Sequence, residues 1–274
     1  MVSRIQELSI GNHYRERSAA ILSIVLLTMA TGIACGAEQA GEHPQKSIRT
    51  VKDALAMVEA NYKQITDLTF DTLVSYSMDK KPQGDPTKFH VQQKGGYMSR
   101  QTQADTGVVT IMNAGRTAYL DNQGRFQGGF EVDTVGNMSS GVVSTNGAPY
   151  YWDMQGFCRE FPGITTNLVE QRPGGLAAFE VVPKDTTTVT RIAYTVDCQR
   201  GIPVEELMYL PGGGSQRILH EAPVLVGPNV WLPTEEAVIE TDPTGLVIEW
   251  RTKISNIKIN QGLADKLFAI PSGR

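Results

Sequence analysis

Cysteine, histidine and positive charge are all scarce in this sequence. Its 274 residues include three Cys and four His, and 25 Lys plus Arg stand against 29 Asp plus Glu, a formal net charge of −4. Three cysteines are too few for a fold held together by disulfides. The acidic balance argues against a nucleic-acid-binding protein, which usually carries a basic patch or stripe. The sequence therefore predicts no nucleic-acid partner.

Motifs that carry catalysis are missing as well. The sequence has no His-Glu-x-x-His, Gly-x-Ser-x-Gly or Walker pattern. The pairs Glu205-Glu206 and Glu235-Glu236 lie in predicted strands, where neighbouring side chains point to opposite faces, so neither pair suits acid–base catalysis. No His stands at metal-ligand spacing from a Cys. We therefore expect no enzyme, no cofactor and no metal, and a β-rich hydrolase with a dispersed site is the least favoured alternative.

Residues 1–34 have the pattern of a secretory signal peptide. Arg15 and Arg17 precede the almost uncharged apolar stretch Ser18–Ala34, and small residues follow it. The stretch is short for a transmembrane helix, which needs ~20 apolar residues. The sequence therefore predicts export.

Two ways of processing this segment stay open. Gly32-Ile33-Ala34-Cys35 resembles a bacterial lipobox, and cleavage there would make Cys35 the lipidated first residue of a membrane-associated protein. Ordinary cleavage after Ala34 or Ala37 would release a soluble periplasmic protein instead.

Cys158 and Cys198 are the two cysteines left if Cys35 is lipidated or removed. One disulfide between them would close a loop of about 40 residues and stabilise the fold by ~3–4 kcal/mol in the chain-entropy model. The alternative is a pair of unpaired, partly buried thiols.

Beyond a polar tether at residues 35–46, the sequence predicts one amphipathic helix over Val51–Thr66. Apolar residues recur there at helical spacing, and Thr50 with Asp53 approximates a capping box. A second short helix is predicted over Pro149–Phe161, where aromatic residues cluster.

The rest of the chain alternates with the period of strands. From Leu68 to Met78, apolar residues at 68, 70, 74, 76 and 78 alternate with polar ones, which predicts a strand with one buried face. Tight turns separate the further predicted strands, which cover 88–93, 97–102, 108–113, 116–121, 168–171, 177–183, 189–197, 203–210, 217–219, 230–241 and 246–258. We expect residues 47–274 to form a single, mainly β domain: a large curved antiparallel sheet covered by the two helices.

The order of these features resembles the LolA/LolB-like carriers of outer-membrane lipoproteins. A signal peptide, an amphipathic helix and a long run of antiparallel strands follow one another over roughly residues 48–271. Local motifs agree with the family in order and spacing: Lys94–Arg100, Asn113-Ala114-Gly115, Asp197–Pro203, Trp231-Leu232-Pro233 and Asn260–Phe268.

The resemblance implies an incomplete β-barrel with an apolar concave face that binds acyl chains of lipoproteins or lipids without chemistry. It also implies envelope transport proteins as further partners. An envelope sensor or regulator of the same architecture, binding a protein through the sheet edge or the 149–161 segment, stays open as an alternative.

Alternation supplies candidates for the lining of such a pocket, each of which can equally be ordinary core. These are Phe70, Val74, Tyr76, Met98, Met208 and Trp250. Arg100 is added because the resemblance implies a basic residue near the pocket. It stands one place later than the family's Arg, and a one-residue shift turns a strand side chain to the opposite face. The alternative for Arg100 is an ordinary solvated strand arginine.

Overall fold

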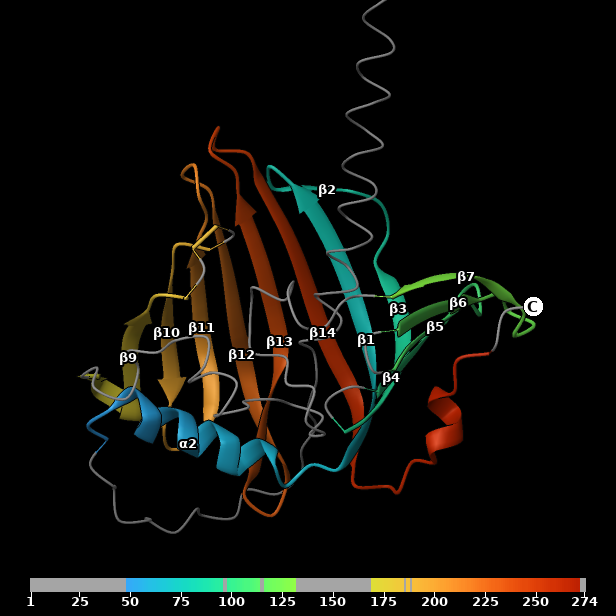
Figure 1. Cartoon of the computed structure of the whole chain (residues 1–274), viewed down its shortest axis with the longest axis horizontal. Helices are drawn as coiled ribbons and strands as arrows, with labels where there is room; N and C mark the ends of the chain where they lie inside the picture. The colour runs from blue at the N-terminus through green and yellow to red at the C-terminus, as the bar shows by residue number, and fades with distance from the viewer. Residues whose placement is uncertain are drawn as a thin grey trace, which may run out of the picture.

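The computed structural model describes residues 48–95, 98–113, 116–131, 169–184, 186–187 and 189–271. Within them, fourteen antiparallel strands form one sheet, and a single α-helix lies against it (Figure 1). The strands are β1 (Asp67–Met78), β2 (Lys81–Pro82), β3 (Thr87–Lys94), β4 (Met98–Gln103), β5 (Val109–Asn113), β6 (Arg116–Leu120), β7 (Phe126–Glu131), β8 (Glu170–Arg172), β9 (Leu176–Val181), β10 (Arg191–Asp197), β11 (Ile202–Tyr209), β12 (Ser215–Gly227), β13 (Val230–Thr241) and β14 (Val247–Ile259). The predicted mainly β fold is confirmed.

The sheet consists of two antiparallel meanders, which are joined where β1 pairs with β14. Its order is β7-β6-β5-β4-β3-β1-β14-β13-β12-β11-β10-β9-β8, and β2 pairs with β1 outside this path. Strands that pair along this path also follow one another in the sequence, with only β2 between β1 and β3. The exception is the pair of β1 and β14, the first and last strands, which pair along almost their whole length. Because β7 and β8 are opposite edges that do not pair with each other within the described residues, the barrel is incomplete there.

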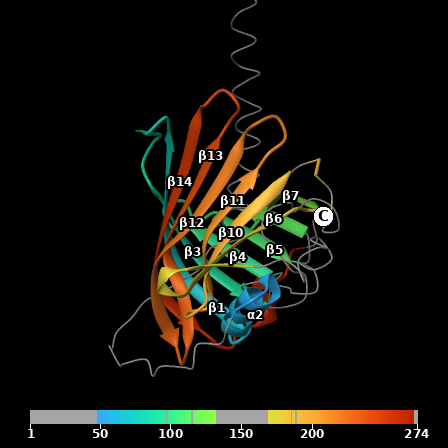
Figure 2. The same ribbon diagram turned by 90° about the vertical axis from the view of Figure 1, so that its left-hand side faces the viewer.

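The sheet is strongly curved. Figures 1 and 2 show β4–β7 turned away from the direction of β9–β14, so that one face of the sheet is concave. We call the face that the helix covers the inner face and the opposite one the outer face.

The alternation in β1 separates these two faces. Leu68, Phe70 and Val74 are buried on the inner face, whereas Leu73 and Ser75 are exposed on the outer face. Cross-strand register carries the inner face to the neighbouring strands, because residues directly opposite each other in a ladder share a face.

The helix α2 (Val51–Tyr62) lies across the inner face of β10, β11 and β13 (Figure 1). Thr50 and Asp53 form the predicted capping box, in which each side chain bonds the other's backbone N–H. The buried apolar stripe on α2 comprises Val51, Ala54, Leu55, Val58 and Tyr62. Each large apolar side chain buried in this way contributes roughly 1.5–3 kcal/mol.

The helix ends earlier than the predicted Thr66. The backbone N–H of Thr66 donates to Asn260 Oδ1 at 2.7 Å, which commits the chain to the turn into β1. Ile65, which continues the apolar stripe, is buried in this turn and not in the helix.

Two contacts fix α2 to the sheet. The Asn61 amide donates to the Trp231 carbonyl oxygen at 2.7 Å and accepts from the Trp231 N–H at 2.8 Å, as a neighbouring strand would. At the β10–β11 turn, Gly201 has φ +66°, and a Cβ there would lie 2.5 Å from the Met57 carbonyl oxygen. Glycine is required at this position by both its backbone conformation and the close approach of the helix.

The C-terminal segment crosses to the outer face of the other meander. Asp67 accepts hydrogen bonds from the backbone N–H groups of Gln261 and Gly262, which directs the chain there. The short 3-10 helix η2 (Asp265–Phe268) then contacts β4 and β5. A second apolar cluster forms beneath this segment from Val109, Ile111 and Leu120, with Ile270 packed against it.

Sequence reasoning missed two strands, β2 and β7, and shortened β12. It gave no strand over β7, where Gly128 and Gly129 weaken the strand signal; a Cβ on Gly129 would lie 2.3 Å from the Thr117 carbonyl oxygen. It ended β12 at Leu219, but the strand continues through Pro223. That extension pairs with β13 and lies beyond the β11 ladder, so it is an edge where proline is tolerated.

Several predictions lie outside the described residues. These are the signal peptide at 1–34, Cys35, the tether at 35–46, the helix at 149–161 and Cys158. Over the described part of the chain, α2 and the two 3-10 helices, η1 (Pro173–Gly175) and η2, lack the length and apolar character needed to cross a bilayer.

Candidate functional site

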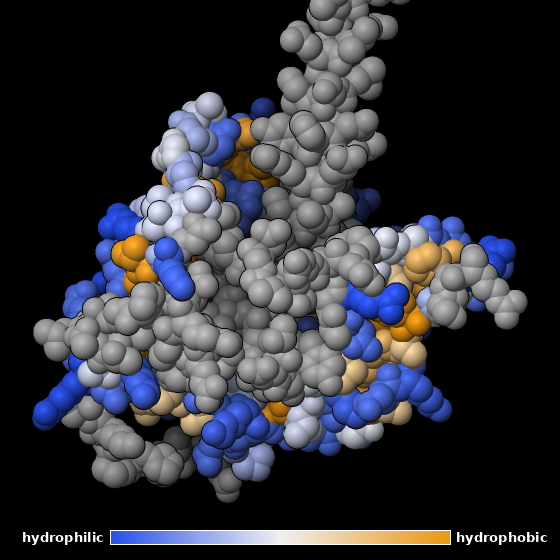
Figure 3. All heavy atoms as spheres, viewed as in Figure 1, coloured by the Kyte–Doolittle hydropathy of each residue, from blue (hydrophilic) through white to orange (hydrophobic). Residues whose placement is uncertain are grey.

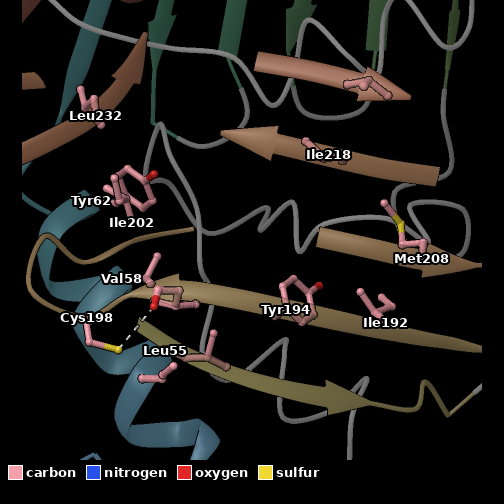
Figure 4. Close-up of a cluster of buried hydrophobic side chains, with 14 of the residues drawn as sticks. Leu55, Val58, Tyr62, Ile192, Tyr194, Cys198, Ile202, Met208, Ile218 and Leu232 are labelled. Carbon is pink, nitrogen blue, oxygen red and sulfur yellow. Dashed lines mark hydrogen bonds between the residues drawn. The ribbon is translucent and has the colours of Figure 1, made fainter. Parts of the chain in front are cut away.

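The inner face of the sheet carries a continuous apolar surface. Register places Tyr76, Trp250 and Val238 side by side on β1, β14 and β13, and the Tyr76 and Trp250 rings lie 5.5 Å apart. Ile218 continues this row on β12. Figure 4 shows Met208, Ile192 and Ile218 on adjacent strands, and Leu55, Val58 and Tyr62 on α2.

Five of the seven predicted pocket residues lie together on this inner face. Phe70, Val74, Met208 and Trp250 are buried members of one hydrophobic cluster, and Tyr76 packs against it while partly exposed. The structure therefore brings these five side chains together, as alternation predicted. Their contact with a ligand stays a prediction.

Met98 and Arg100 do not join them. Phe70 opposes Val91, which opposes Gln101, so odd-numbered residues of β4 face inward and even-numbered ones face outward. The Arg100 guanidinium accordingly lies on the outer face, where its Nη1 donates to the Leu267 carbonyl oxygen of η2 at 3.4 Å. Met98, an even-numbered residue of the same strand, is likewise placed on the outer face.

The outer face around these two residues is not uniformly polar. Figure 3 shows apolar residues on the right-hand side of the molecule, in the region of β5, β6 and η2, interrupted by hydrophilic residues. There, Lys94 anchors the C-terminal segment by donating to Asp265 Oδ1 and to the Leu263 carbonyl oxygen, both at 2.6 Å.

A buried polar row, which we define as Tyr194, Glu206, His220, Glu236 and Thr252, crosses the middle of the apolar inner face. Its members lie on the adjacent strands β10 to β14, and Glu236 stands directly opposite both His220 and Thr252. His220 lies between the two carboxylates: its Nε2 is 3.4 Å from Glu206 Oε1, and its Nδ1 is 3.3 Å from Glu236 Oε2. All three side chains are less than a tenth exposed.

The two carboxylates hold His220 in its charged form. Burial by itself lowers the pKa of a histidine, but hydrogen bonds to Glu206 and Glu236 and their negative charges outweigh it and raise the pKa of His220 to about 9. An imidazole with a carboxylate at each nitrogen donates through both, which requires the doubly protonated ring.

Two phenols adjoin the polar row. Burial, reinforced by the charge of Glu206, raises the pKa of both Tyr62 and Tyr194 far above the ordinary value, and Glu236 adds to the effect at Tyr62. Tyr62 is the last residue of α2, so the C-terminal end of the helix lies next to the charged cluster. Both phenols are neutral under all ordinary conditions.

Buried polar atoms without a hydrogen-bond partner occur on the same face. They include Glu206 Oε2, Thr252 Oγ1 and Thr72 Oγ1. Buried polar groups are nearly always satisfied in folded proteins, so unsatisfied ones call for an explanation.

The sequence analysis did not predict the polar row, because it compared Glu206 and Glu236 only with their sequence neighbours Glu205 and Glu235. Glu205 and Glu206 do point to opposite faces, as predicted, and so do Glu235 and Glu236. Another feature of the sequence could have predicted the row: Glu206, His220 and Glu236 each stand two positions from an apolar residue on the same face of the strand. A polar residue in the apolar phase of three consecutive strands marks a buried polar row.

This cluster does not constitute a metal site. No group of three or more His, Cys, Asp or Glu side chains in the described ranges is arranged to hold a metal ion.

Cys198 is buried and directly follows β10 (Figure 4), and it pairs with no other cysteine of the described residues. Its Sγ donates to the Val196 carbonyl oxygen at 3.8 Å, and burial together with the charge of Asp197 raises its pKa to about 12. A thiol with so high a pKa is a poor nucleophile at neutral pH. Because Cys158 lies outside the described residues, the disulfide between the two stays a prediction.

No family model and no curated protein matches the sequence. Solved structures do match the fold. A DUF1329 family protein from Desulfovibrio piger is 13% identical with a TM-score of 0.55, and the alignment covers 80% of this chain and 95% of that one. A LolA superfamily protein from Nitrosomonas europaea is 14% identical with a TM-score of 0.54, covering 81% and 98% of the two chains.

The fold is LolA-like. A third match, an outer membrane lipoprotein-sorting protein domain from Vibrio parahaemolyticus, is 11% identical with a TM-score of 0.55 over 80% of this chain and 97% of that one. The LolA-like part of the chain thus corresponds to almost the whole of each matching structure. The resemblance noted from the order of motifs in the sequence is confirmed at the level of the fold.

Proposed function

We propose that the protein is an exported, non-enzymatic binder of acyl chains that carries a lipoprotein or lipid in the bacterial cell envelope. The observation that carries this proposal is the apolar inner face of a curved, unclosed sheet, with Tyr76, Trp250 and Met208 on it and α2 across one end. The name of the Vibrio structure, a lipoprotein-sorting domain, supports the same class of ligand.

The chemistry of such a face fits acyl chains. Transfer of a chain from water to an apolar surface gains ~0.8 kcal/mol for each buried CH₂ group, and it requires no reacting group. Met208 adds a flexible, polarisable side chain that adapts to differing chains. The open edges β7 and β8 leave the inner face unenclosed by strands within the described residues, which a carrier needs in order to load and release its cargo.

The place of action follows from the start of the sequence. The signal peptide predicted over residues 1–34 would direct the chain to the periplasm, and a lipid on Cys35 would anchor it to a membrane there. Envelope transport proteins that load or unload the carrier are proposed as its partners.

Native mass spectrometry of the mature protein, purified from its own envelope, tests this proposal. We expect acyl ligands to co-purify, and the mass of the chain itself will report whether Cys35 is lipidated. Tyr76→Glu places a charge on the inner face and should reduce the retained ligand several-fold. Ser75→Glu, one residue away on the outer face, is the matched control and should retain it.

An empty protein would contradict the carrier. If a polypeptide co-purified in place of lipid, the result would favour an envelope regulator of the same architecture. Equal ligand retention by the Tyr76 and Ser75 variants would remove the inner face from the proposal.

A further inference from the structure

We propose that Glu206, His220 and Glu236 form a headgroup site within the inner face, selective for an amphiphile with a positively charged amine. This inference rests on the proposed function, since it assumes that the acyl chain lies on the same face. It adds the class of headgroup, which the fold does not specify.

The charges of the cluster favour a cation. Two carboxylates face one imidazolium, so the three side chains together carry a single negative charge when His220 is protonated. The phenols of Tyr62 and Tyr194, which adjoin the cluster, add no charge because burial keeps them neutral. A carboxylate or phosphate headgroup would meet two like charges in a poorly solvated place, where repulsion is strong.

The unsatisfied atoms favour a hydrogen-bond donor. Glu206 Oε2 has no partner, although the Glu206 side chain is buried. Thr252 is 1% exposed, points to the same face directly opposite Glu236, and its Oγ1 is also without a partner. An ammonium group has three donors and no acceptor, so it can satisfy the open oxygen of Glu206; the Thr252 hydroxyl lies three strands away on β14, beyond the reach of the same group.

Leaving these atoms unsatisfied would be costly. A buried polar group without a partner costs ~1–3 kcal/mol, and a charged one costs more. Replacing the polar residues by apolar ones would avoid this penalty, because purely structural buried ion pairs seldom add net stability. The retained polarity is therefore better explained by a ligand that supplies the missing donors.

The surroundings of the row place an acyl chain next to this headgroup. On each strand from β11 to β14, a residue two positions from the member of the polar row lies on the same face and is apolar. These residues are Met208, Ile218, Val238 and Trp250. Tyr76 extends the apolar side of the row to β1. An amphiphile can thus lay its chain over these residues while its amine meets Glu206.

The outer face supplies matched controls one residue away. Glu205 accepts from Arg217 Nε at 2.6 Å, and Glu235 accepts from Lys253 Nζ at 2.9 Å, both in contact with solvent. Glu206→Gln and Glu236→Gln therefore remove the same charge as Glu205→Gln and Glu235→Gln, but from the opposite face.

Binding of three probes of equal chain length to the delipidated mature protein tests the proposal. Isothermal titration calorimetry at neutral pH would compare dodecylammonium, dodecanoate and dodecanol. We expect dodecylammonium to bind at least about tenfold more tightly than dodecanoate, a difference of about 1.4 kcal/mol. Glu206→Gln should abolish most of this preference and leave dodecanol binding unchanged, whereas Glu205→Gln should keep it.

A second variant tests whether the loss of any buried polar group has the same effect. Thr252→Val preserves shape and removes a buried hydroxyl three strands from Glu206, so it should keep the preference for dodecylammonium. If dodecanol binds but the amine is no tighter than the carboxylate, the headgroup site is overturned and acyl-chain binding stands. If none of the three probes binds, the proposed function falls together with this inference.

Discussion

The two faces of β11–β13 carry the same kinds of side chain in opposite states. On the outer face, Glu205 and Glu235 pair with Arg217 and Lys253 in solvent. On the inner face, their sequence neighbours Glu206 and Glu236 converge on His220 and are buried. Strand parity alone decides which carboxylate meets water, so one position along the chain separates a solvated ion pair from a buried one.

Exposed and buried ion pairs contribute differently to the free energy of unfolding. Exposed ion pairs contribute a median of ~0–1 kcal/mol, because solvent screens them and long side chains lose entropy. Removing one partner of a buried pair costs ~3–5 kcal/mol, because an uncompensated charge stays buried. The inner pairs are therefore unsuited to adding net stability but strongly constrain which residues can occupy the site.

The largest expected effect comes from removing the central cation. His220→Leu leaves Glu206 and Glu236 facing each other without compensation and should lower the free energy of unfolding by about 3–5 kcal/mol. Arg217→Leu, which removes a cation from the neighbouring outer-face position of β12, should lower it by less than about 1 kcal/mol. Urea titration followed by circular dichroism measures both, and equal losses would contradict the distinction between the faces.

The apolar residues of the two faces should differ in the same direction. Met208 is 1% exposed on the inner face, and Met208→Ala should cost about 2–4 kcal/mol through lost burial and the cavity left behind. Leu73 is 40% exposed on the outer face, and Leu73→Ala should cost less than about 1 kcal/mol. Thermal unfolding of the two variants measures both losses of stability. A Met208→Ala protein as stable as Leu73→Ala would show that the core on the inner face tolerates a cavity at this position.

Alkaline pH should weaken the inner face selectively. The folded pKa of His220 is raised to about 9 from an unfolded value of 6.5, so its stabilisation is complete below pH 6.5 and is lost as the pH rises through 9. The loss should amount to about 3 kcal/mol. Urea titrations at pH values on both sides of this window would measure it.

Histidine 220 can be tested as the source of this dependence. His220→Gln keeps a hydrogen-bonding side chain without a titrating proton and should flatten the alkaline loss. The outer-face pair of Asp71 and His90 behaves oppositely: burial opposes the shift, but hydrogen bonds from Asn256 and His90 lower the pKa of Asp71, so its contribution disappears at acidic pH. An unchanged alkaline loss in His220→Gln would place its origin elsewhere.

Much of the fold was predictable because it depends on local patterns. The apolar stripe and the Thr50–Asp53 box located α2, and alternation located most strands with their buried faces. The Asp197–Gly201 turn was also predictable from the sequence, since the Asp197 side chain accepts hydrogen bonds from the backbone N–H groups of Gln199 and Arg200. These features need only neighbouring residues to form.

The candidate site was less predictable because it depends on register between strands. Alternation grouped Phe70 and Trp250 correctly, but it could not show that Glu206, His220 and Glu236 would converge, because their strands are aligned by turns and bulges such as the register shift between Leu225 and Gly227. Arg100 illustrates the same limit, since only the register of β4 against β3 shows that it points to the outer face and to η2.

The smallest expected effect lies in the outer ion pair of Glu235 and Lys253, and it sharpens the comparison most directly. A double-mutant cycle with Glu235→Gln and Lys253→Gln isolates their coupling, which should be below about 1 kcal/mol and fall further in high salt. The same cycle with Glu236→Gln and His220→Gln should give a larger, salt-insensitive coupling, because buried charges are poorly screened. Glu235 and Glu236 are adjacent in sequence, so different couplings can only reflect the faces to which they point. Equal couplings would mean that solvent reaches the inner face and screens Glu236 as it screens Glu235.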